Sequence, residues 1–118
     1  MAAGEKSPIV LINIGCIYSM VGEINRAKKI LDDLIELSTQ RYVDAWGIAS
    51  LAGELRLDDL AFEWLNKGYN DRSPNMFMVP LDVSLAHLHS DPRFIELIRK
   101  MGLDFYYKEF KQSNTFPR

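Results

Sequence analysis

The chain has 118 residues, 47% of them apolar and 25% charged, which is the size and composition of one soluble globular domain. Its formal net charge of −2 argues against a protein whose main task is to hold nucleic acid, because that affinity needs an excess of Lys and Arg. Cys16 is the only cysteine, so an internal disulfide is excluded and the redox compartment stays open.

The amino-terminal part is where a targeting or membrane segment would be expected. Residues 1–7 are small and polar and lack the basic run that precedes a signal-peptide core. The apolar run from Ile9 to Val21 is shorter than the roughly 20 residues that span a bilayer, and it contains Asn13, Gly15 and Ser19. We therefore expect no membrane insertion and a cytoplasmic location, with the periplasm as the alternative for a part of a membrane-anchored regulator.

The first predicted helix runs from about Pro8 to Met20. Its apolar residues recur at helical spacing and are Leu11, Ile14, Gly15, Tyr18 and Val21. Ser7 is placed to cap this helix, Pro8 suits its first turn, and Gly22 suits its end.

A second predicted helix follows, with one apolar and one charged side. The apolar side carries Ile24, Ala27, Ile30, Leu31, Leu34 and Ile35. The other side carries Lys28, Lys29, Asp32, Asp33 and Glu36, which are spaced for pairing between successive turns. We interpret these charges as a solvated face, since an acid–base pair would need carboxylates of differing burial.

The same pattern recurs after 34 residues: Ala61 matches Ala27 (61 − 27 = 34), Leu65 matches Leu31, and Ile48 matches Ile14. In the second copy one helix is lined by Ala45, Ile48, Ala49, Ala52 and Leu55, and the next by Leu60, Ala61, Trp64, Leu65 and Tyr69. Asp58 or Asp59 is the predicted cap of the latter helix. A period of this length with helical spacing inside each copy is typical of helix–turn–helix repeat arrays.

Beyond Pro74 the residue pattern changes. Pro80 ends a short apolar run and excludes an ordinary helix interior there, and Val83 to Leu88 is predicted as one or two helical turns. Asp91 and Pro92 predict a helix start, and Gly102 its end. The apolar stripe of this last helix is Phe94, Leu97, Ile98 and Met101. No stretch has the alternation of a strand, so the predicted fold class is all-α.

The tail from Asp104 to Arg118 places aromatic residues beside lysines. These are Phe105, Tyr106, Tyr107 and Phe110, with Lys108 and Lys111. Stacking on single-stranded nucleic acid would use such residues, but two lysines in an acidic chain give it little support. We expect the tail to pack against the last repeat or to fold back into the groove, and we expect no nucleic-acid partner.

From about Pro8 to Pro74 the chain resembles a tetratricopeptide repeat protein. Small residues stand where the helices of such a repeat cross, at Gly15, Ala27, Ala49, Ala61 and Gly68. The second copy departs at Ala52, where an aromatic residue is usual, and at Arg56, where glycine is usual. The resemblance implies a right-handed α-α superhelix of about two helix pairs and a capping helix. We divide this single domain into repeat one (8–41), repeat two (42–75), a capping segment (76–103) and a tail (104–118).

The later part is similar to a narrower pattern. The strings AFEWL (61–65), DRSP (71–74), SDPRF (90–94) and MGL (101–103) resemble the final repeat and closing helix of tetratricopeptide regions at the C-termini of bacterial signalling proteins. Those proteins include winged-helix transcription regulators, adenylate cyclases and protein kinases. The resemblance implies that the last stretch caps the array, and repeat arrays need such caps because each end otherwise exposes an apolar face.

In that family the first helix of each pair lines a concave groove, which implies a set of groove positions here. They are Ile9, Ile12, Cys16, Met20, Val43, Trp46, Ser50 and Glu54. An apolar groove with Trp46 and Met20 would suit an amphipathic helix or an extended peptide. The alternative is that Ile12 and Trp46 pack against the neighbouring repeat or the tail.

Members of the family that bind chaperone tails use lysine and asparagine in this groove. Here Ile12, Cys16, Trp46 and Ser50 stand at the corresponding places, which argues against that function.

The sequence contains few residues that could form a catalytic or metal-binding site. His87 and His89 are the only histidines, and a spacing of two does not place both on one helix face. We therefore expect a surface turn there, no metal and no cofactor. Cys16 is expected to be a buried small residue, since no base stands beside it in sequence. An enzyme would have to use these three residues, so we predict no catalytic residues.

The sequence thus predicts a protein–protein interaction module that binds a peptide or helix in its groove. The family resemblance places such a module in a larger bacterial signalling or transcription-regulatory protein. The alternative is a homodimerisation module that associates through its uncovered N-terminal face, at Ile9 and Leu11.

Overall fold

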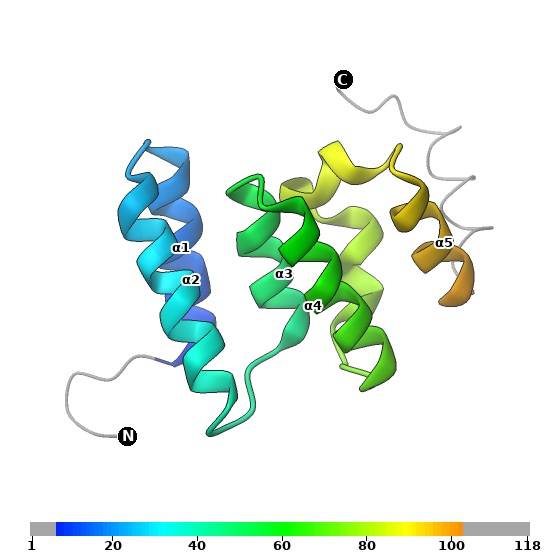
Figure 1. The fold of residues 1–118 in the computed structure, drawn as a ribbon, viewed down its shortest axis with the longest axis horizontal. Coiled ribbons are helices and arrows are strands. Elements are labelled where there is room, and N and C mark those ends of the chain that lie inside the picture. Colours follow the sequence, from blue (N-terminus) through cyan, green and yellow to red (C-terminus); the bar gives the residue numbers. More distant parts are fainter. Residues whose placement is uncertain (1–6, 103–118) are drawn as a thin grey trace.

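The computed structural model describes residues 7–102, so the predicted aromatic tail lies outside the described residues (Figure 1). Within this range every regular element is helical, and the predicted all-α class is confirmed. The elements are α1 (Pro8–Met20), α2 (Ile24–Ser38), α3 (Ala45–Glu54), α4 (Asp58–Asn70), the 3-10 helices η1 (Met76–Leu81) and η2 (Val83–Leu88), and α5 (Pro92–Lys100).

Most helix ends follow from local sequence. The Ser7 hydroxyl accepts a hydrogen bond from the Val10 N–H (3.4 Å), and Asp91 accepts one from the Arg93 N–H (2.9 Å) at the start of α5. Gly22 and Gly102 follow α1 and α5 in the left-handed region, with φ of +86° and +74°. These positions confirm the predicted caps and ends of the two helices.

The predicted cap of α4 is wrong. The N-cap residue is Leu57, which offers no side-chain hydrogen bond, and Asp58 and Asp59 stand inside the first turn instead. Both carboxylates are favoured there by the helix dipole and are turned toward cations or donors of later segments. The two aspartates therefore act between elements and do not close their own helix.

The helices pair along the chain. α1 packs against α2 and α3 against α4, while α1 also packs against α3, so that the array runs from α1 and α2 at one end to α5 at the other (Figure 1). The second helices begin at Ile24, Asp58 and Pro92, which are 34 residues apart each time (58 − 24 and 92 − 58). The 34-residue spacing of the backbone thus continues past Pro74, where the residue pattern changes.

The segment formed by η1 and η2 lies between α4 and α5 in the chain. η2 packs on α3, and α5 packs on α4. Pro80 lies inside η1, and the segment adopts short 3-10 turns in place of one α-helix. The segment and α5 together cover the C-terminal end of the second pair.

Close helix contacts depend on two small residues of α3. A Cβ on Gly47 would collide with the Ile12 side chain of α1, and a Cβ on Gly53 would lie 2.9 Å from the Ser84 carbonyl oxygen at η2. α3 therefore packs closely on both α1 and η2, with the Ile12 side chain against Gly47 and the Ser84 backbone against Gly53. The buried side chains from Ile12 to Ile98 form one continuous core.

Candidate functional site

α1 differs from the other helices in its composition. Its sequence, PIVLINIGCIYSM, carries no charged side chain, and apolar residues occur around its whole circumference. A helix of this kind is ordinarily buried on all sides. Here one side packs on α2 and α3, while large aliphatic side chains on the other side are exposed. α1 and α2 lie at the end of the fold opposite α5 (Figure 1).

The uncovered side forms an exposed apolar surface, which we call the α1 face. It consists of Ile9, Val10, Asn13, Ile17, Met20 and Val21. Ile17 is 58% exposed, Val21 67% and Met20 74%. Val10, Asn13, Ile17 and Met20 alternate in steps of three and four residues, which places them along one side of the helix. Asn13 is the polar member of this surface.

A shallow cleft between α1 and α2 adjoins the α1 face. It is lined by Leu11, Ile14, Tyr18, Asn25, Arg26, Lys29 and Ile30. Its cations already have partners: Arg26 pairs with Glu23 (3.4 Å) and lies over the Tyr18 ring, and Lys29 pairs with Asp33 (2.7 Å). The apolar surface of α1 therefore extends toward α2 and ends at charges that are neutralised by their neighbours.

The structure separates the predicted groove residues into two groups by burial. Ile12, Val43 and Ser50 are buried, and Ile12 fills the space beside Gly47. These three side chains have almost no surface to offer a partner. Ile9 and Met20 are exposed and belong to the α1 face.

The remaining predicted groove residues, Cys16, Trp46 and Glu54, are half-buried. The Trp46 indole Nε1 donates to Asp82 Oδ2 (2.9 Å), and the other oxygen of Asp82 caps η2 by accepting from the Ser84 N–H (2.9 Å). Asp82 thus ties α3 to the capping segment. The α3 part of the predicted groove is covered by this chain's own residues.

Cys16 lies close enough to the carboxylates of Glu54 and Asp82 for their charges to affect its thiol. Burial, and then the negative charges of Glu54 and Asp82, together raise the pKa of its thiol to about 11. A thiol with such a pKa is almost fully protonated at neutral pH and is a poor nucleophile. This chemistry agrees with a packing role for Cys16.

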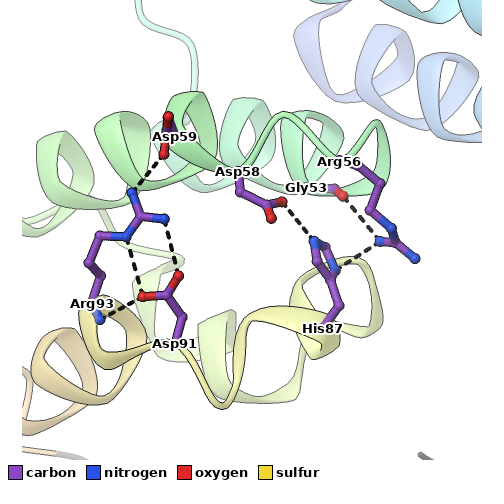
Figure 2. Close-up of polar contacts among 7 residues, drawn as sticks. All are labelled: Gly53, Arg56, Asp58, Asp59, His87, Asp91 and Arg93. Atoms are coloured by element: carbon purple, nitrogen blue, oxygen red, sulfur yellow. Dashed lines mark hydrogen bonds and ion pairs between the residues drawn. The ribbon is translucent and has the colours of Figure 1, made fainter.

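His87 joins η2 to the turn between α3 and α4, as Figure 2 shows. Arg56 Nη1 lies 2.8 Å from His87 Nδ1, and His87 Nε2 lies 2.9 Å from Asp58 Oδ1. Because a guanidinium only donates, Nδ1 accepts and the Nε2–H donates to Asp58. His87, which was predicted to lie in a surface turn, therefore links η2 to α4 and to the turn before it.

Arg93 makes the corresponding link for α5. Its guanidinium reaches Asp59 Oδ1 (2.8 Å) on α4 and Asp91 at its own helix start (Figure 2). The guanidinium also lies over the Phe62 ring, 4.2 Å from its centroid. Sequence reasoning missed both links, because each joins residues about 30 positions apart and no local pattern marks them. Both clusters fasten the capping segment to α4 and to the turn before it.

Two further findings concern the described residues alone. Between residues 7 and 102, His, Cys, Asp and Glu side chains nowhere gather in a group of three or more that is able to hold a metal ion. In the same range, each helix is too short or too polar to cross a membrane.

Comparisons with known protein families, with curated proteins and with solved structures found no match to this chain. Its function is therefore inferred from its own residues and their arrangement.

Proposed function

We propose that this chain is a helical-repeat interaction module of the tetratricopeptide type, which binds a protein or peptide partner and has no catalysis of its own. The observation that carries the proposal is the α1 face, where an uncharged apolar helix is exposed at the end of the array. Contiguous exposed apolar surface on a globular protein is typical of interaction sites. The repeated spacing of the second helices supports the repeat class.

The chemistry of the face favours binding by burial. Each Å² of apolar surface removed from water contributes roughly 25 cal/mol, so covering a few large aliphatic side chains gives useful affinity. Met20 is suited to varied partners, because its unbranched side chain adapts to different shapes. An amphipathic helix laid along α1 would match the spacing of Val10, Ile17 and Met20.

The polar clusters support the non-catalytic part of the proposal. His87, Arg56 and Asp58 bind one another across elements, as do Arg93 and Asp59. Their hydrogen-bonding groups are used to hold the capping segment. Following the family resemblance, we place the module in a larger bacterial signalling or transcription-regulatory protein.

A selection of displayed random peptides on the purified chain tests the proposal. We expect enriched peptides with apolar residues at helical spacing, and we expect Met20→Asp to weaken their binding at least about tenfold, since a charge would be buried against apolar groups. Ile95→Asp is the matched control, because Ile95 is also an exposed helical aliphatic residue (52%) but lies on α5. Equal binding by both variants would contradict the α1 face as the site.

A further inference from the structure

We infer that the partner of the α1 face is a second copy of this chain, and that the two copies are related by a two-fold axis that passes beside Asn13. This inference rests on the proposed function, since it uses the same face, and it goes further by naming the occupant. A two-fold contact requires a surface that is complementary to itself. Three properties of α1 meet that requirement: its lack of charged residues, the exposed amide of Asn13, and its position at one end of the fold.

The charge on the face favours a second copy. α1 carries no Asp, Glu, Lys or Arg from Pro8 to Met20, so contact between two α1 faces buries no charge of the helix itself. The cations beside the face, Arg26 and Lys29, are already paired with Glu23 and Asp33. The surface therefore selects no oppositely charged partner and suits another uncharged one.

Asn13 gives the contact its register. Its exposed side chain has no hydrogen-bond partner among the residues that the structure describes, and it lies between Val10 and Ile17 on the face. A purely apolar partner would leave the amide buried and unsatisfied, which is costly. A second Asn13 offers both a donor and an acceptor, but the two amides meet only if the two-fold axis passes between them. A single asparagine within an apolar helix seam sets register in the same manner.

The position of α1 leaves room for the second copy. α1 and α2 lie at one end of the fold and α5 at the other, so another molecule can approach α1 without meeting α5 (Figure 1). The 13 residues of α1 give a helix of about 20 Å. Contact along one helix of that length buries less surface than a standard interface, which buries about 800 Å² on each partner. We therefore expect a reversible, concentration-dependent dimer.

The solution mass of the full chain, measured by light scattering over a roughly hundredfold range of concentration, tests the inference. We expect the mass to rise from the 13.6 kDa of one chain toward that of two chains. Ile17→Asp should remain monomeric throughout, while the control Ile95→Asp should behave as the unaltered chain does. Because both residues are exposed, helical content should be unchanged in either variant. A monomer at every concentration, or an Ile17→Asp variant that still dimerises, would overturn the inference.

Disulfide trapping tests the axis separately. In a Cys16→Ser background, Asn13→Cys should form a cross-linked dimer under mild oxidation, because equivalent residues beside a two-fold axis approach within disulfide distance. Asn66→Cys in the same background is the control, since Asn66 is exposed on α4. Equal cross-linking of the two variants would refute the axis at Asn13.

The two proposals fail in different ways. A chain that stays monomeric but binds selected peptides in a Met20-dependent manner refutes the second copy and leaves the proposed function standing. A chain that neither dimerises nor binds such peptides refutes both.

Discussion

Cys16 shows how the fold sets the chemistry of a single side chain. The thiol is half-buried on the inner side of α1, and its pKa rises from the usual 9.0 to about 11, first because of burial and then because of the charges of Glu54 and Asp82. From sequence, Cys16 was a candidate for contact with a partner in the groove. In the structure its thiol is half-buried against the core, and this burial together with the charges of Glu54 and Asp82 keeps it protonated.

We predict that Cys16 reacts slowly with iodoacetamide near pH 8. A pKa two units above the usual value leaves about 100-fold less thiolate at that pH, and the thiolate is the reacting form. The rate, followed by mass spectrometry, should keep rising up to about pH 11, and Glu54→Gln should raise it. A native chain that reacts as fast as the chain in urea would contradict the prediction.

The same pKa has a consequence for stability. As pH rises from 9.0 to about 11, the unfolded chain releases the thiol proton while the folded chain still holds it. The folded state is therefore favoured by this group below pH 9.0 and loses that contribution across this window. The free energy of unfolding, measured by urea titration at several pH values, should therefore fall between pH 9.0 and about 11. The Cys16→Ser variant has no thiol and serves as the control, because this part of the fall should be missing from it.

At the scale of elements, the capping segment depends on Asp82. One carboxylate oxygen accepts from the Trp46 indole and the other caps η2, so a single side chain connects α3 to the segment. We predict that Asp82→Ala lowers the free energy of unfolding by about 1–3 kcal/mol, because a half-buried indole N–H and a helix start both lose their acceptor. Urea titration followed by circular dichroism measures the change.

Asp82→Asn is the matched variant for that prediction. The amide keeps one acceptor oxygen of the same shape, so its cost should lie between those of the unaltered chain and Asp82→Ala. If both variants unfold as the unaltered chain does, the Trp46–Asp82 contact does not hold the segment.

The contrast between α1 and this segment explains which features the sequence could predict. The bounds and caps of α1 and the start of α5 follow from Ser7, Pro8, Asp91 and Pro92, which act within one helical turn. The docking of η2 depends on pairs such as Trp46 with Asp82, 36 positions apart, and no local pattern marks them. The α1 face had a signal in sequence, the absence of charge from Pro8 to Met20, but its exposure depends on what packs against the helix.

At the scale of the whole molecule, the helices between residues 7 and 102 have one covered and one exposed end. η2 and α5 cover the second helical pair and bury Leu85, Leu88 and Phe94, while α1 leaves large aliphatic side chains in solvent. Stacked helical units owe much of their stability to contacts with neighbouring units, so loss of one end weakens the rest. The continuous core from Ile12 to Ile98 predicts that the two ends unfold together.

Phe94→Ala tests this coupling. Phe94 is fully buried beneath the covered end, so its truncation should lower the free energy of unfolding by about 3–5 kcal/mol, a large part of the roughly 5–15 kcal/mol that stabilises a small domain. Tryptophan fluorescence reports on α3 and α4 through Trp46 and Trp64, whereas circular dichroism also includes α1 and α2. If the array is one cooperative unit, both midpoints shift together.

The neighbouring Ile95→Ala, at an exposed position, should leave both midpoints nearly unchanged. Separate midpoints in Phe94→Ala would instead mean that the α1–α2 pair stays folded when the covered end is lost, and that the helical pairs are independently stable units.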